Sequence, residues 1–118
     1  MLTLIKCLKI LPLILLGASA ACAAADPALV RQKIAAGALV LDVRTIEEFN
    51  AGHYPGATHI PVQVLRERIG ELGAPGKPVV IYCRTGRRSE IARGILLEHG
   101  FTDVTNAGGL TDMPVPGN

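Results

Sequence analysis

Cys83 is the one cysteine of the sequence outside its first 25 residues, and it stands at the start of a short basic loop. This loop has the sequence Cys83-Arg84-Thr85-Gly86-Arg87-Arg88-Ser89. Gly86 can adopt backbone angles that side chains forbid, which lets the loop curl around the sulfur. A curled loop that leads into a helix directs backbone N–H groups and the positive end of the helix dipole inwards. Such a place stabilises a thiolate, a persulfide or a bound oxyanion.

The inward backbone N–H groups, the helix dipole and the three arginines of this loop predict that the Cys83 thiol has a pKa below the ~8.5 of a free cysteine. A thiolate would then be present at neutral pH, as nucleophilic catalysis requires. Taken alone, a cysteine at a strand end is more typical of a buried, inert side chain under a solvated basic loop. The combination of strand, glycine, arginines and helix favours the reactive nucleophile.

Four apolar segments predict the strands that position this loop. Cys83 directly follows Val79-Val80-Ile81-Tyr82, and similar segments lie at residues 38–43, 58–60 and 104–106. Continuous apolar runs of this length indicate strands that are buried on both faces. Ligands of parallel sheets collect at the carboxyl ends of such strands, which is where Cys83 stands.

Amphipathic helices are predicted between the strands. Thr45 and Glu48 have the spacing of a capping box, and Asp26-Pro27 is a typical helix start. The expected helices cover residues 27–36, 45–51, 62–72 and 89–99. Strands that alternate with helices predict one α/β domain, in which a central parallel sheet has helices on both faces.

Polar residues at one other strand end are candidates for structural support of the site. Asp42 and Arg44 end the strand at 38–43, and we expect them to form an ion pair near the Cys83 loop. Gly108-Gly109 follows the last predicted strand, and we expect it to form a turn.

The sequence predicts neither a metal nor a cofactor. His53, His59, His99 and Cys83 lack the spacing of a zinc site. We expect His53 to bond backbone in its Pro-Gly-Ala turn rather than to act in catalysis. Neither glycine pattern typical of nucleotide sites is present.

Residues 1–25 have the order of a secretory signal peptide, which leaves residues 26–118 as the domain. Lys6 and Lys9 form a basic start, residues 10–18 are apolar, and small residues follow up to Ala25. The apolar part is shorter than the roughly 20 residues of a membrane span. We therefore expect export to the periplasm, with cleavage after Ala23 or Ala25.

Cys22 allows a second interpretation of the leader, as a lipid attachment site. Ala20 and Ala21 fit the small-residue box of lipid-anchored proteins, whereas Ser19 stands where leucine is usual. Either form of processing leaves Cys83 without a partner for a disulfide bond within the domain.

The mature chain has no excess of charge. The sequence holds twelve basic residues, of which Lys6 and Lys9 lie in the leader, and ten acidic residues outside it. A neutral domain gives no support to nucleic acid as a partner.

The segment from Cys83 to Ser89 resembles the active-site loop of the rhodanese-like sulfurtransferases. Residues 49–60 resemble the family signature of an aromatic residue, a histidine and Pro-Gly-Ala, although Tyr54 replaces the usual aliphatic residue. Residues 41–44 and 107–110 resemble the strand-end and C-terminal motifs. The likeness extends from about Ala28 to Asp112, and it is closest to the single-domain exported rhodaneses of the phage-shock type.

This resemblance implies a rhodanese-like fold and a double-displacement reaction without a cofactor. Cys83 would take sulfur from thiosulfate as a persulfide and pass it to cyanide, a thiol or a protein acceptor. For Arg88 the resemblance leaves two roles open, donor binding and closure of the loop through its carbonyl groups. The expected substrate-binding residues are Arg84, Thr85, Gly86, Arg87 and Arg88.

Three other functions remain as alternatives. The first is a persulfide carrier that delivers sulfur to a partner protein, and the second is a cysteine phosphatase or arsenate reductase. The six residues from Cys83 to Arg88 resemble the sulfur-transferring members, because the phosphatase and reductase relatives carry one residue more. The third is an anion-binding domain without catalysis, which the presence of Cys83 disfavours.

Overall fold

A four-stranded parallel sheet forms the centre of the computed structural model, which describes residues 24–117. Most of the predicted leader, including Cys22, lies outside the described residues. The strands lie in the order β2-β1-β3-β4, with every neighbouring pair parallel. They are β1 (Leu39–Asp42), β2 (Thr58–His59), β3 (Val79–Cys83) and β4 (Val104–Gly109).

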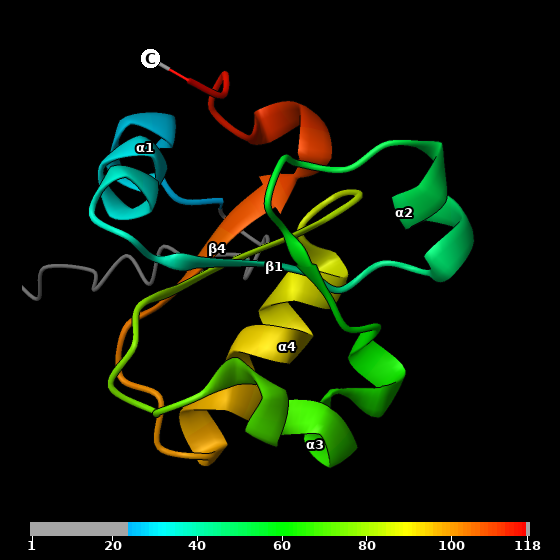
Figure 1. Ribbon diagram of the computed structural model, residues 1–118, viewed down its shortest axis with the longest axis vertical. Helices are drawn as coiled ribbons and strands as arrows, with labels where there is room; N and C mark the ends of the chain where they lie inside the picture. The colour runs from blue at the N-terminus through cyan, green and yellow to red at the C-terminus, as the bar shows by residue number, and fades with distance from the viewer. Residues whose placement is uncertain (1–23, 118) are drawn as a thin grey trace, which may run out of the picture.

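Helices cover both faces of the sheet, because strand side chains alternate between two cores. Figure 1 shows α1 (Pro27–Ala35) on one side of the sheet and α3 (Leu65–Arg68) and α4 (Arg87–Glu98) on the other. Strand residues in the α3 and α4 core are Leu41, Val79, Ile81 and Cys83, and Val43 joins them directly after β1. Those in the α1 core are Val40, Val80, Tyr82 and Ala107. The predicted α/β architecture is confirmed.

Capping groups fix the starts of two helices as the sequence predicted. Asp26 Oδ1 accepts a hydrogen bond from the Ala28 N–H at 2.9 Å at the start of α1. At the start of α2 (Ile46–Ala51), Thr45 Oγ1 accepts from the Glu48 N–H, and Glu48 Oε1 accepts from the Thr45 N–H, both at 3.2 Å. This capping box sets α2 directly after β1, at the carboxyl edge of the sheet.

The segment 62–72 differs from the single helix that we expected. It divides into the 3₁₀ helix η1 (Val62–Val64), α3 and a second 3₁₀ helix, η2 (Ile69–Leu72). The backbone leaves the helical region at Val64 (φ −113°, ψ 6°) and again at Arg68 (φ −107°, ψ 9°). A spacing of three residues suits a 3₁₀ turn as well as an α-helix, so the apolar pattern could not separate the two.

Gly108-Gly109 was wrongly predicted as a turn, because both residues belong to β4. Gly109 pairs with Cys83 of β3 beyond a register irregularity between Ile81 and Cys83. Glycine is unusual inside strands and marks a place where another backbone approaches closely. Here the approaching backbone is that of the Cys83 loop.

A 3₁₀ helix, η3 (Leu110–Asp112), follows β4. None of the described helices combines the length and the apolar character that crossing a membrane requires.

Candidate functional site

The Cys83 sulfur lies at the carboxyl end of β3, enclosed by its own loop. The Cys83 side chain is 0% exposed, and its Sγ accepts a hydrogen bond from the Gly86 N–H at 3.0 Å. Gly86 has a φ of +93°, which turns its amide back towards the sulfur and which a residue with a side chain would adopt only under strain. The curled loop expected from the sequence is therefore present.

Ser89, in the first turn of α4, supplies a hydroxyl to the same sulfur. Its Oγ lies 3.3 Å from Cys83 Sγ. Burial acts to raise the pKa of the Cys83 thiol, but the Ser89 hydroxyl and the amides of Ser89, Thr85 and Gly86 outweigh it. The net effect is a pKa below the ordinary value for cysteine, because each of these donors bonds the thiolate form more strongly.

Replacing Ser89 by alanine is expected to raise the pH at which Cys83 becomes reactive. A hydrogen bond to a charged group contributes ~1.5 kcal/mol or more, so alkylation below the midpoint should slow by roughly tenfold. The measurement is the rate of alkylation of the Cys83 peptide by a small reagent as a function of pH. Thr102→Ala, which removes an exposed hydroxyl elsewhere, is the control, and an unchanged midpoint in Ser89→Ala would contradict the assignment.

Asn106 of β4 ties the elements around the sulfur together. Its Oδ1 accepts from the Gly108 N–H at 2.9 Å and lies 2.8 Å from Ser89 Oγ, so it competes with Cys83 Sγ for the single proton of the Ser89 hydroxyl. Its Nδ2 donates to the Gly86 carbonyl at 3.0 Å and to Glu90 Oε2 at 3.1 Å. The loop, α4 and β4 thus share one buried amide side chain.

Gly109 allows the loop to lie directly on β4. A Cβ atom at this position would overlap the carbonyl oxygen of Arg84 and lie 3.0 Å from the carbonyl carbon. A Cβ at Gly86 would lie 3.3 Å from the Gly108 Cα. Since these neighbours are backbone atoms, the loop could not keep its place against a larger residue at 109.

Arg88, at the end of the loop, forms a bidentate ion pair with Glu48 of α2. Its Nη1 and Nη2 donate to the two Glu48 carboxylate oxygens at 2.6 and 2.9 Å. The pair lowers the pKa of Glu48 to about 2, chiefly through the Arg88 hydrogen bonds. Arg88 therefore joins the loop to α2 through Glu48, and this pairing occupies the guanidinium that could otherwise bind an anion.

Asp42 and Arg44 form the ion pair expected at the end of β1. Arg44 Nη2 lies 2.7 Å from Asp42 Oδ2 and also donates to the Gly52 carbonyl at 2.8 Å. The Tyr82 hydroxyl donates to Asp42 Oδ2 at 2.6 Å. Burial would raise the pKa of Asp42, but hydrogen bonds from Arg44 and Tyr82 bring it below its ordinary value.

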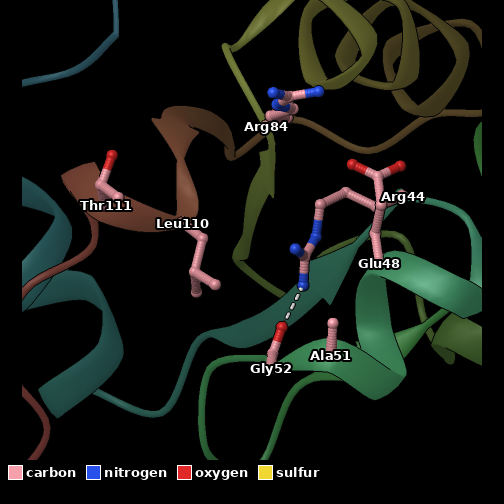
Figure 2. Close-up of a pocket in the computed structure, with 7 residues that line it drawn as sticks. All are labelled: Arg44, Glu48, Ala51, Gly52, Arg84, Leu110 and Thr111. Carbon is pink, nitrogen blue, oxygen red and sulfur yellow. Dashed lines mark hydrogen bonds between the residues drawn. The ribbon is translucent and has the colours of Figure 1, made fainter.

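A pocket of about 360 Å³ borders the loop at Arg84. Figure 2 shows its lining residues, with the Arg44 guanidinium bonded to the Gly52 carbonyl within it. Arg84, Thr85 and Arg87 are exposed, and neither Arg84 nor Arg87 forms an ion pair with another described residue. The lining comprises Arg44, Glu48, Ala51, Gly52, Arg84, Leu110 and Thr111.

The histidines take part in local structure. His53 Nδ1 lies 3.0 Å from the Phe49 carbonyl, and its ring stacks on the Phe49 ring. His59 Nε2 lies 2.7 Å from the Arg44 carbonyl, and His99 Nδ1 lies 2.8 Å from that of Ile95. Within residues 24–117, no group of three or more His, Cys, Asp or Glu side chains is arranged to hold a metal ion.

A model of the rhodanese-like domain matches residues 26–112. The chain belongs to the rhodanese-like family. The matched range includes the loop that encloses Cys83, at the carboxyl end of the central strand β3.

Known rhodanese relatives share much of this domain. The thiosulfate sulfurtransferase PspE of Escherichia coli is 44% identical over 78 residues, which cover 64% of this chain and 74% of that protein. The putative sulfur carrier protein YrkF of Bacillus subtilis is 42% identical over 67 residues, 57% of this chain but 36% of that protein. A solved E. coli rhodanese with anions superimposes with a TM-score of 0.62 at 41% identity, covering 69% of this chain and 100% of the other.

Sequence reasoning missed four residues that organise this rhodanese loop. Ser89 could have been found, because it immediately follows the loop and opens a helix. Glu48 already had a predicted role in the capping box, so its pairing with Arg88 was not expected. Asn106 carried no local signal, and Gly109 was noted only within the C-terminal motif at 107–110, since the roles of both residues arise only when β4 lies beside the loop.

Proposed function

We propose that this rhodanese is a sulfurtransferase that takes sulfane sulfur from thiosulfate and carries it as a persulfide on Cys83. The observation that carries the proposal is the Cys83 sulfur, which receives the Gly86 amide and lies beside the Ser89 hydroxyl. These donors lower the pKa of the thiol despite its burial. The likeness to a thiosulfate sulfurtransferase over most of the domain supports the same donor.

In the first step, the Cys83 thiolate attacks the outer sulfur of thiosulfate. A bond forms between the two sulfurs, the sulfur–sulfur bond of thiosulfate breaks, and its electron pair leaves with sulfite. In the second step an acceptor nucleophile attacks the outer sulfur of the persulfide, and the electron pair of the broken bond returns to Cys83. A covalent intermediate of this kind gives ping-pong kinetics.

The arginines of the loop divide between two roles in this mechanism. Arg84 and Arg87 are exposed and unpaired among the described residues, so they can bind the anionic oxygens of the donor and offset charge on sulfite. Arg88 holds the loop against α2 through Glu48. Because Cys83 is 0% exposed, the loop must move to admit the donor.

Steady-state kinetics with thiosulfate and cyanide test this proposal. Thiocyanate formation is measured while thiosulfate is varied at several fixed cyanide concentrations. Parallel lines in a double-reciprocal plot are expected, since sulfite departs before the acceptor reacts. Intersecting lines would contradict the persulfide route, and no thiocyanate at any concentration would contradict the activity.

A persulfide carrier is the second candidate, favoured by the likeness to the putative sulfur carrier protein. Arg84 and Arg87 are the two exposed cations of the Cys83 loop. They would also suit a protein acceptor with acidic groups. The same assay separates the candidates. A carrier would release about one equivalent of sulfite on loading and then form thiocyanate only slowly.

We also propose that residues 1–23 form a cleaved leader and that the mature chain begins at Ala24 in the periplasm. Ala25 supports this boundary, because its N–H donates to the Asn106 carbonyl at 2.9 Å and its side chain packs against the α1 core. Cleavage after Ala25 would remove both contacts. The mass of the protein from the periplasmic fraction tests the boundary, and a start at Asp26 or a lipid on Cys22 would contradict it.

A further inference from the structure

A second pocket lies on the α1 side of the sheet and shares no lining residue with the pocket at Arg84. Its walls come from α1 and from the C-terminal segment, which Figure 1 shows in red ending close to α1. Tyr54, which also lines it, belongs to the α1 core, whereas Cys83 belongs to the core on the opposite face. We call this space the α1 pocket, and its lining includes Arg31, Ile34, Ala35, Tyr54, Pro114 and Val115.

One cation stands at the α1 pocket without a counterion. Arg31, Ile34 and Ala35 share one face of α1, because residues three and four positions apart are neighbours on a helix. Arg31 is exposed and forms no ion pair with another described residue. Among the described residues that line the pocket it is the only charged one. A ligand there therefore meets a single positive charge.

The Tyr54 side chain is buried, yet its hydroxyl has no hydrogen-bond partner within residues 24–117. Tyr54 is 8% exposed, and its backbone N–H donates to the Tyr82 hydroxyl at 2.9 Å. No fully enclosed side-chain nitrogen or oxygen of the described chain lacks a partner, so the Tyr54 hydroxyl keeps contact with solvent, which the α1 pocket provides. The aliphatic residue usual at this position in the family has no such group. Because a buried tyrosine hydroxyl normally has a partner, its free state points to a polar group of a ligand.

The C-terminal segment adds an apolar wall to the α1 pocket. Met113 packs against the α1 core and Pro114 is buried, which anchors the segment. Val115 follows and lines the pocket, although it is apolar and 69% exposed. A ligand that covered Val115 and Ile34 would remove apolar surface from water, which favours binding.

The volume of the α1 pocket limits its ligand to about the size of one ring. The pocket holds about 250 Å³, which is below the roughly 300–1,000 Å³ typical of sites for drug-sized ligands. It exceeds the ~150 Å³ of an apolar cavity that accommodates benzene. A small inorganic anion would leave the apolar wall uncovered, so the ligand has a carbon body.

We propose that the α1 pocket binds a small monocarboxylate whose apolar body is about the size of one ring. The carboxylate accepts hydrogen bonds from the Arg31 guanidinium and the Tyr54 hydroxyl, which together suit its two oxygens. Its single negative charge matches the single cation of the pocket. The body of the ligand lies against Ile34, Pro114 and Val115. This binding does not depend on the sulfur chemistry of Cys83.

A titration with three probes tests both parts of this ligand. Benzoate carries the charge and the ring, benzyl alcohol carries the ring without the charge, and acetate carries the charge without the ring. Each is added to the purified protein while the backbone amides of Ala35 and Val115 are followed by NMR. Saturable shifts are expected with benzoate, at an affinity at least about tenfold above that of either other probe. No saturable shift with benzoate, or equal affinity for benzyl alcohol or acetate, would overturn the proposal.

Two substitutions test the groups that hold the carboxylate. Arg31→Gln and Tyr54→Phe should each weaken benzoate binding about tenfold, as the loss of one hydrogen bond to a charged group gives. Arg84→Gln is the matched control, because it removes the same charge from the other pocket, and it should change the affinity by less than about twofold. If Arg84→Gln weakened binding as much as Arg31→Gln does, the effect would come from net charge and not from the α1 pocket.

Two further measurements separate this site from the fold and from the sulfur chemistry. Because the Tyr54 hydroxyl has no partner within the described chain, Tyr54→Phe should keep the melting temperature of the wild type. A marked fall in that temperature would show that the hydroxyl serves the fold, which would contradict the proposal. Cys83→Ser should bind benzoate as tightly as the wild type does, even if thiosulfate proves not to load Cys83. Loss of binding in that variant would mean that the ligand lies at the Cys83 loop instead.

Discussion

Cys83→Ser is expected to abolish sulfur transfer from thiosulfate while leaving the fold intact. The serine hydroxyl can keep the hydrogen bonds to the Gly86 amide and Ser89, but it does not form a persulfide. We expect the rate of thiocyanate formation to fall at least about a thousandfold, as when other enzymes lose their nucleophile. The measurement is the initial rate at saturating substrates.

Thermal unfolding supplies the control for this variant. A melting temperature close to that of the wild type would show that the lost rate reflects the missing sulfur. Retention of more than a few per cent of the activity in folded Cys83→Ser would mean that another group carries the reaction.

Gly109→Ala is expected to have the second-largest effect, although it lies outside the loop. The added methyl group would overlap the Arg84 carbonyl oxygen, so the loop must move away from β4. Forcing an extra carbon into packed surroundings costs about 1–3 kcal/mol of folding stability. A shift of about 1 Å at a reacting centre can lower the rate on the order of a hundredfold.

Gly94→Ala is the matched control for that substitution. Gly94 lies in α4, where a Cβ would meet no atom within 4 Å. Alanine there should raise stability by ~0.5–1 kcal/mol and leave sulfur transfer unchanged. Urea denaturation and kcat for the two variants check the pair of expectations, and a Gly109→Ala protein with wild-type kcat would show that the close approach is unimportant.

The local patterns of the sequence were sufficient for the architecture. The apolar run 79–82 predicted the central strand, and the Thr45–Glu48 spacing predicted the capping box that the structure shows. The loop from Cys83 to Ser89 predicted a curl around the sulfur because Gly86 permits the required backbone angles. Each of these features depends on residues that are close together in the chain.

Features that depend on contacts across the fold were not predictable in the same way. The Arg88–Glu48 pair joins residues forty positions apart, and both had plausible local roles. Asn106 looked like an ordinary residue of a last strand, yet its side chain bonds the loop and α4. The length of β4 was underestimated because two glycines in sequence are more typical of a turn than of a strand end.

The depth of the sulfur also came only from the structure. No sequence pattern indicated how exposed the thiol is, and the structure shows Cys83 fully buried by its loop. Hydrogen-bond donors can lower a pKa inside a protein when they outweigh the cost of burial. Movement of the loop therefore becomes part of the proposed reaction.

Intact mass spectrometry tests the central claim most directly. The purified protein is incubated with thiosulfate, freed of small molecules and weighed, with Cys83→Ser treated in the same way. The proposed mechanism predicts that the wild type gains the mass of one sulfur atom, which added cyanide removes, and that the variant gains nothing. A wild-type mass unchanged by thiosulfate, or an equal gain in the variant, would contradict a persulfide on Cys83.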